Sequence, residues 1–301
     1  DCGGGVDGLM ASSWIGDDIW RRLFEKIVIK EEELVALRRL CELERPLVLL
    51  GTNKSFVDFL LMAYVLHGQG LQPAHIQVPC GSSDISLFNR VVRTAGAFYL
   101  ASRRGSGNPV ARAIYKEYVK TLMENNATVQ ISLNSHRSRD GVIGAPDQLE
   151  VLNTIIETLM EGAVQEVNFL PININYERLF EMELDPLKPF GETKSEENFA
   201  TVLESFRRLS GNLGKVYVSI GEPISLNSYS GGSVKDQMSQ KWANEIAKQW
   251  LQGVVAMPTS IVASVLLMNQ QGMSEEELVH QFDWLCDQLV DRGVNLLDIE
   301  K

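Results

Sequence analysis

The chain has 301 residues, of which 45% are hydrophobic and 22% charged, which is the composition of an ordinary globular protein. Its formal net charge of -11 and its isoelectric point near 5.0 argue against nucleic acid as a partner and against broad adhesion to anionic lipid. The longest apolar runs, such as residues 261–268, are far shorter than the ~18 residues of a membrane span, so we expect any membrane contact to be peripheral or through a partner.

The chain begins with two segments of helical periodicity. Apolar residues at helical spacing predict helices over 13–29 and 31–43, and together they form an N-terminal helical extension over residues 1–45. After Pro46 the period changes, and short apolar runs predict buried strands. These strands are expected at residues 47–51, 75–78, 97–101, 128–133, 167–176 and 215–220.

Helical segments separate the predicted strands. They are expected at residues 56–66, 84–92, 110–123, 149–160 and 195–209, followed by C-terminal helices over 234–251, from Pro258, and from Ser274 through Val290. Strands that alternate with helices of this length indicate βαβ units. We therefore predict an α/β fold with a mainly parallel central sheet flanked by helices, which occupies residues 46–301 as one domain.

A candidate site follows the first of these strands. Asn53 comes directly after the strand over residues 47–51, and Asp58 lies in the first turn of the next helix. This loop belongs to the carboxyl edge of the predicted sheet, where ligands of open α/β folds usually bind.

The segment Asn53-Lys-Ser-Phe-Val-Asp58 resembles the first motif, H-R-S-x-x-D, of the glycerol-3-phosphate and dihydroxyacetone-phosphate acyltransferase family. Three further segments resemble the other motifs of that family in the same order: residues 96–100 with Arg103 and Arg104, residues 134–139, and residues 170–178, which match a V-P-I-x-I-x-Y strand. The resemblance covers roughly residues 46–293 and is nearest to the dihydroxyacetone-phosphate branch.

The resemblance implies a division of roles among these residues. In active relatives the first-motif histidine removes a proton from the acceptor hydroxyl, and the aspartate, here Asp58, orients it. Arginines of the second and third motifs bind the acceptor phosphate, which implies a substrate-binding role for Arg103, Arg104, Arg137 and Arg139. Ser138 of the third motif and Pro171 of the fourth are assigned to the same site. No cofactor is implied, and acyl-CoA is a co-substrate only if the chain is active.

The chain departs from the family at the positions that carry chemistry. The histidine is replaced by Asn53, whose amide cannot titrate, whereas an imidazole with a pKa of about 6.5 can act as a base at neutral pH. The glutamate of the third motif is replaced by Asn134. Asn53 is more simply interpreted as a turn residue, and Asp58 either as a partner of the helix dipole or as a functional group.

Other polar and titratable groups also have simple structural interpretations. His136 lies in the third motif and is a candidate for a relocated base, although nothing in the sequence places it near an acceptor hydroxyl. The four arginines either form a phosphate pocket or make ordinary ion pairs. The four cysteines are widely spaced, and the scattered histidines suggest no metal cluster, so no metal site is predicted.

Our leading hypothesis is an inactive acyltransferase-like protein that serves as an accessory or scaffold subunit of a membrane-associated assembly, with other protein subunits as partners. The start at Asp1 indicates either a removed organelle-targeting presequence or a boundary within a longer product, and the mitochondrion is favoured over the peroxisome. The first alternative is an active O-acyltransferase with a non-standard base. The second is a module that binds phospholipid or acyl-CoA without turnover.

Overall fold

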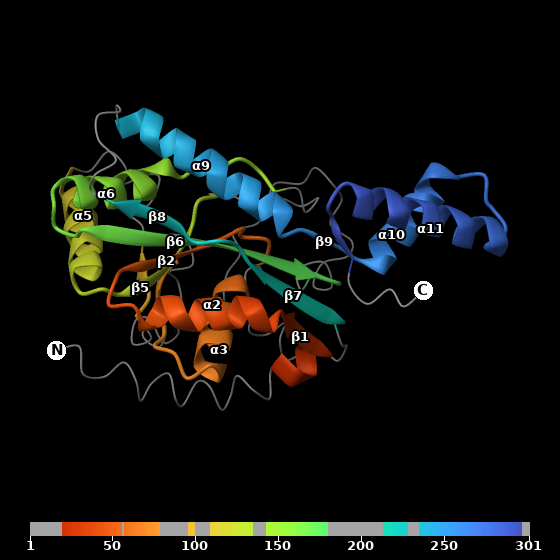
Figure 1. Cartoon of the computed structure of the whole chain (residues 1–301), viewed down its shortest axis with the longest axis horizontal. Coiled ribbons are helices and arrows are strands. Elements are labelled where there is room, and N and C mark those ends of the chain that lie inside the picture. Colours follow the sequence, from red (N-terminus) through yellow and green to blue (C-terminus); the bar gives the residue numbers. More distant parts are fainter. Residues whose placement is uncertain are drawn as a thin grey trace.

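The computed structural model describes residues 20–55, 57–78, 96–99, 109–134, 143–179, 213–227 and 235–296. Within these residues an eight-stranded sheet runs through the centre of the molecule (Figure 1). Its strands are β1 (Lys26–Ile29), β2 (Leu47–Gly51), β3 (His75–Val78), β4 (Phe98–Tyr99), β5 (Thr128–Ser132), β6 (Glu166–Tyr176), β7 (Lys215–Ile220) and β8 (Ile224–Asn227).

The sheet is mostly parallel. Its order is β1-β7-β6-β2-β5-β3-β4, and five of the neighbouring pairs are parallel. The antiparallel pairs both involve the long strand β6, whose first half pairs with β8 and whose second half pairs with β7. The sheet therefore contains the predicted parallel core, and it changes direction on one side of β6.

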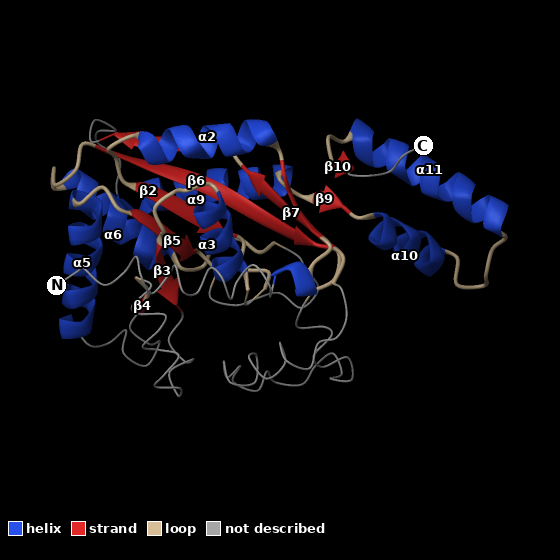
Figure 2. Ribbon diagram, turned by 90° about the horizontal axis from the view of Figure 1, so that it is seen from below, coloured by secondary structure: helices blue, strands red, loops and turns tan. Residues whose placement is uncertain are grey.

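Helices cover both faces of this sheet (Figures 1 and 2). They are α2 (Glu31–Glu42), α3 (Asp58–Gly68), α5 (Pro109–Glu124), α6 (Leu149–Met160) and α9 (Lys235–Gln252). Helices α5, α6 and α9 pack on one face and α2 and α3 on the other, so the sheet separates two apolar cores. No helix among the described residues is long and apolar enough to cross a membrane.

Strand β2 illustrates why the sheet forms. All four of its apolar side chains are almost completely buried, with Val48 and Leu50 in the core beneath α5, α6 and α9, and Leu47 and Leu49 in the core beneath α2 and α3. Strands that are buried on both faces need continuous apolar runs, because each neighbouring residue faces a different layer of helices. This is the pattern from which the strand was predicted.

Most predicted helices and strands agree with the structure, but the helix predicted at the N-terminus agrees only in part. The bounds of β2, β3, β7 and α6 are those that the sequence predicts. The helix predicted over residues 13–29 is wrong at its end, because residues 20–23 are helical but Lys26–Ile29 form β1 and pair with β7. Strand β8 was not predicted. The predicted helices over 84–92 and 195–209 lie outside the described residues, and the domain boundary at residue 45 stays a prediction.

Beyond the sheet, the chain ends in a helical hairpin. Helices α10 (Pro258–Met268) and α11 (Glu275–Asp291) are antiparallel neighbours that stand out from the body of the molecule, next to the small sheet of β9 (Val255–Ala256) and β10 (Asn295–Leu296) (Figure 2). Helix α11 begins at the predicted residue with a capping box, in which the Ser274 hydroxyl accepts from the Glu277 N–H and the Glu277 carboxylate accepts from the Ser274 N–H.

Candidate functional site

The first-motif loop connects β2 to α3 at the carboxyl edge of the sheet. Asn53 has a φ of 55°, a left-handed conformation that asparagine adopts more readily than most residues. Its side-chain N–H donates to the Asn134 carbonyl oxygen at 3.2 Å, and Asn134 follows the neighbouring strand β5. The side chain at the histidine position of the motif therefore makes a structural link between two strand ends.

Asp58, the first residue of α3, organises the same loop. Its side chain is only 7% exposed. One carboxylate oxygen accepts from the Lys54 N–H at 2.8 Å, and the other accepts from the Ser55 N–H at 3.2 Å and from the Tyr176 hydroxyl at 2.6 Å. Hydrogen bonds to a buried carboxylate are among the stronger ones in proteins, so Asp58 fixes the loop to its own helix and to β6.

Lys54 crosses from this loop to the opposite side of β6. Its ammonium donates to the side-chain oxygens of Asn173 at 2.8 Å and Asn175 at 2.9 Å. Burial lowers the pKa of Lys54 to about 8, while the nearby charge of Asp58 acts in the other direction. A mostly protonated lysine at neutral pH thus lies within two residues of the position where the family has its base.

The two asparagines carry this network to the end of α9. The Asn173 amide donates to the Trp250 carbonyl oxygen at 2.6 Å, and the Asn175 amide donates to the Gly253 carbonyl oxygen at 3.0 Å. The Trp250 indole N–H in turn donates to the Leu50 carbonyl oxygen at 2.9 Å. The motif loop is therefore held between β2, β6 and the turn that leads to the C-terminal hairpin.

Two buried side-chain oxygens beside the loop have no hydrogen-bond partner among the residues that the structure describes. They are the side-chain oxygens of Thr52 and Asn134, in residues that are 5% and 9% exposed. Buried polar atoms are rarely left unpaired, and acceptors of this kind suit a water molecule or a hydroxyl group of a ligand. Asn134 thus supplies an acceptor at the position of the family's glutamate but no titratable group.

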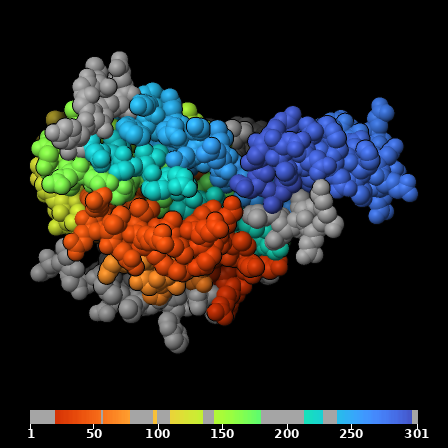
Figure 3. Space-filling model, viewed as in Figure 1, coloured from red at the N-terminus to blue at the C-terminus, as the bar shows by residue number. Residues whose placement is uncertain are grey.

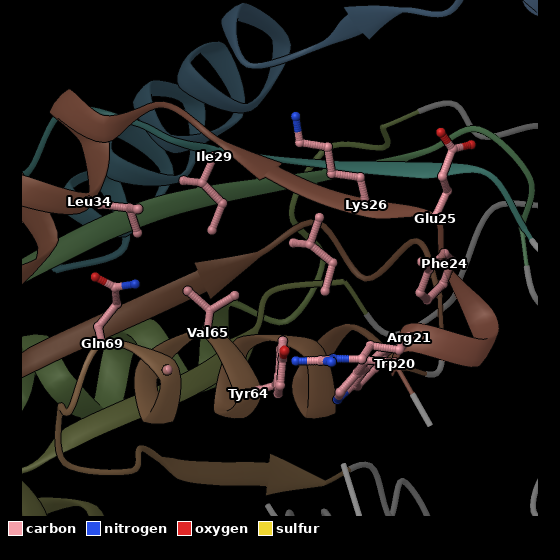
Figure 4. Close-up of a pocket in the computed structure, with 12 residues that line it drawn as sticks. Trp20, Arg21, Phe24, Glu25, Lys26, Ile29, Leu34, Tyr64, Val65 and Gln69 are labelled. Carbon is pink, nitrogen blue, oxygen red and sulfur yellow. The ribbon is translucent and has the colours of Figure 1, made fainter. Parts of the chain in front are cut away.

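A cavity of about 360 Å³ lies elsewhere, between β1, α2 and α3 (Figure 4). Aromatic and aliphatic side chains line it, among them Trp20, Phe24, Tyr64 and Val65, with Arg21, Glu25, Lys26 and Gln69 among the polar ones. Neither Asn53 nor Asp58 lines it. One of its lining residues, Phe24, contacts the motif, because its ring centroid is 5.9 Å from that of Tyr176, whose hydroxyl donates to Asp58.

The structure describes some of the predicted site residues and brings them together. Asn53, Asp58 and Asn134 meet at one edge of the sheet, and Pro171 is in β6 opposite Leu50, with its carbonyl oxygen accepting from the Gly221 N–H at 2.8 Å. The predicted relocated base and the predicted phosphate-binding residues lie outside the described residues: Arg103, Arg104, His136, Arg137, Ser138 and Arg139. Their roles stay predictions.

Lys54 and Tyr176 were not predicted as site residues, although both lie within the motifs that carry the resemblance. The tyrosine of the V-P-I-x-I-x-Y pattern was a signal for Tyr176, since its ring could have been expected at the same sheet edge as Asp58. Among the described residues no group of three or more His, Cys, Asp or Glu side chains could hold a metal ion.

Comparisons with known proteins agree with the motifs. Residues 190–300 match the family model of the glycerol-3-phosphate acyltransferase C-terminal region. The dihydroxyacetone phosphate acyltransferase of Mus musculus is 28% identical over 287 residues, which are 89% of this chain and 42% of that protein. The glycerol-3-phosphate acyltransferase of Pasteurella multocida (strain Pm70) is 28% identical over 285 residues, which are 88% of this chain and 34% of that protein.

A solved structure is also similar. The 1-acyl-sn-glycerophosphate acyltransferase PlsC from Thermotoga maritima superposes with a TM-score of 0.45 at 16% identity, over 80% of both chains. The present chain spans less than half the length of the curated relatives it matches. Over most of its own length it is similar to the dihydroxyacetone phosphate and glycerol-3-phosphate acyltransferases, and residues 190–300 match the glycerol-3-phosphate acyltransferase C-terminal region.

Proposed function

We propose that this chain is an acyltransferase-like protein without acyl-transfer activity, which serves as an accessory or scaffold subunit of a membrane-associated assembly. The observation that carries the proposal is Asn53. An amide at the position of the motif histidine cannot take a proton from an acceptor hydroxyl, and general-base catalysis is typically worth about 10²–10⁴-fold in rate. The Asn53 amide is instead bound to the Asn134 carbonyl oxygen.

The surroundings of Asn53 support the same proposal. The Asp58 carboxylate, which orients the histidine in active relatives, is occupied by two backbone N–H groups of the loop and by the Tyr176 hydroxyl. A sheet and a network of hydrogen bonds thus hold the motif loop, whereas asparagines stand at the positions of the first-motif histidine and the third-motif glutamate. A protein retained for its shape would show this combination.

The test is acyl transfer by the purified protein, with acyl-CoA as donor and glycerol 3-phosphate or dihydroxyacetone phosphate as acceptor. We expect no release of coenzyme A above that from a heat-unfolded sample. Asn53→His would restore the missing base, and Asn53→Gln is its matched control, since glutamine is similar in size to histidine and cannot titrate. Transfer by the unaltered protein at the rates usual for such enzymes would overturn the proposal.

One observation favours the alternative of an active enzyme with a non-standard base. Lys54 belongs to the motif loop, and burial brings its pKa to about 8, within the range in which an amine can act as a base. If transfer is detected, Lys54→Met should abolish it, and the rate should rise with pH through the pKa of the lysine. Loss of transfer in His136→Ala instead would identify the relocated base.

The remaining parts of the proposal concern partners and compartment. We place the assembly at an organelle membrane, with the mitochondrion ahead of the peroxisome. Fractionation of cells that express the tagged protein tests this, because the tag should appear with mitochondrial membranes and at a mass well above that of one chain. Binding of acyl-CoA or phospholipid without turnover would instead support the binding-module alternative.

A further inference from the structure

The outer face of α10 is unusual for a protein of such high negative charge. From Pro258 to Ser274 the chain contains no Asp, Glu, Lys, Arg or His, although the whole chain has a net charge of -11. Only Ile261 and Val265 of α10 are buried. Leu266, Leu267 and Met268 are 47%, 70% and 61% exposed, so the helix presents large apolar side chains to solvent at its end.

The exposed face of α10 is arranged by size. Its first half presents the small side chains of Thr259 and Ser260, its last turn presents Leu266 and Leu267, and Ala263 lies between them. Ala263 is the middle residue of Pro258–Met268, and at 100° per residue it is also near the middle of the exposed arc. A two-fold axis at Ala263 would therefore place Leu267 of one helix against Thr259 of the other, and Leu266 against Ser260.

The charges of the hairpin fit the same arrangement. The outer face of α11 carries the exposed acids Glu276, Asp283, Asp287 and Asp291. Helices α10 and α11 pack through their inner faces, with Asn269 donating to the side chain of Gln281 at 2.8 Å, so the acidic face and the uncharged face point in different directions. Contact through α10 thus brings two chains together without placing their acidic faces against each other.

The same charges disfavour a lipid surface as the occupant. Three glutamates, Glu275, Glu276 and Glu277, form the first turn of α11, at the end of the hairpin where Leu267 and Met268 are exposed. Insertion of this end into a bilayer would bring those carboxylates toward the headgroups and the hydrocarbon, which is unfavourable for charged groups. A protein surface that covers only α10 leaves the carboxylates in water.

We propose that the outer face of α10 is a self-association surface, on which a second copy of this chain packs its own α10 antiparallel about a two-fold axis near Ala263. Such an interface is isologous, because both chains contribute the same surface and each contact between two different residues occurs twice. Small residues at the crossing allow the helix axes to approach within about 8 Å. An 11-residue helix is about 16 Å long, so the contact is smaller than a standard interface, and dissociation in the micromolar range is expected. Self-association through α10 does not depend on whether Asn53 disables catalysis.

The first test is sedimentation velocity of the whole chain over a concentration series. The unaltered protein should shift from monomer to dimer, and Leu267→Glu should weaken dimerisation at least about 10-fold, because it places a carboxylate in the apolar contact. Val290→Glu is the matched control, since Val290 is an exposed apolar residue (56%) on the acidic side of α11 and should leave the dimer unchanged. A chain that stays monomeric at all concentrations, or that loses the dimer equally in both variants, would overturn the proposal.

The second test determines whether the two-fold axis lies near Ala263. Ala263→Cys should form a disulfide between two chains under mild oxidation, whereas Val279→Cys on α11 should form no more than the unaltered protein. The reverse result would place the interface elsewhere. If the protein is monomeric but sediments with neutral phosphatidylcholine vesicles, and Leu267→Glu abolishes this, then lipid and not a second copy covers α10, and the proposal fails.

Discussion

Because the Lys54 amine is buried, the stability of the protein is expected to depend on pH. Its pKa is about 8 in the folded protein, below the ordinary value of 10.5, because burial disfavours the charged form. Below about pH 8 the amine is protonated in both the folded and the unfolded chain, and the full cost of burying the charge is present. Between the two pKa values the unfolded chain binds more protons, so stability rises as the pH rises.

The size of this effect follows from the two pKa values. Between pH 7 and pH 9 the linkage relation gives an increase of about 1 kcal/mol in the free energy of unfolding, as an order of magnitude. Cys41 acts in the opposite sense near the upper end of this window, because burial raises its pKa to about 11 and the folded thiol then holds its proton longer than the unfolded one. The comparison must therefore be made between variants that share Cys41.

The assay is urea unfolding at pH 7 and pH 9 of the unaltered protein and of Lys54→Met. From pH 7 to pH 9 the free energy of unfolding should increase by about 1 kcal/mol more in the unaltered protein than in Lys54→Met. Lys248→Met, which removes an exposed lysine of α9, is the control and should behave like the unaltered protein. Equal pH dependence in the unaltered protein and in Lys54→Met would refute the reasoning.

Three further substitutions test the described contacts. Asp58→Ala removes three hydrogen bonds to a buried carboxylate and should lower the free energy of unfolding by about 3 kcal/mol. Its control, Glu275→Ala at the exposed first turn of α11, should change the free energy of unfolding by less than about 1 kcal/mol. Equal effects of the two substitutions would show that the buried contacts do not stabilise the loop. Gly96→Ala should cost about 1–2 kcal/mol in denaturant unfolding, because Gly96 has a φ of 87° and an added Cβ would be 3.1 Å from the His75 imidazole; an unchanged midpoint would contradict this. Ser274→Ala removes half of the capping box and should weaken α11 by about 1 kcal/mol, seen as faster amide hydrogen exchange in that helix but not in β2.

The strands of the central sheet were predictable because their sequences alone require burial on two faces. The residues of β2 are an example, since a run of four apolar side chains between polar segments has few other solutions. Strand β1 was not predictable in the same way. Ile27 continues the helical spacing of the preceding residues, and its strand conformation depends on pairing with β7, which is about 190 residues further along the chain.

The candidate site was likewise predictable from the sequence only in part. The pattern of a strand followed by a loop and a helix was enough to predict that Asn53 and Asp58 lie at the carboxyl edge of the sheet. The structure places Asn134, which follows the neighbouring strand β5, beside them. The path of Lys54 to Asn173 was not predictable. It depends on which face of β6 the asparagines occupy and on how closely the motif loop approaches that strand, and both are set by tertiary packing.

The strand pairing also determines when the motif loop can reach its final form. The ribosome adds Trp250 long after the motif loop, because Trp250 is 200 residues downstream of Leu50, whose carbonyl oxygen accepts from its indole. Likewise, β1 can pair with β7 only after residues 215–218 have been synthesised. During synthesis the first half of the chain therefore has a strand edge without its partner. Contacts between residues so far apart in the sequence also form slowly. A nascent chain of this kind should depend on chaperones until α9 has left the ribosome.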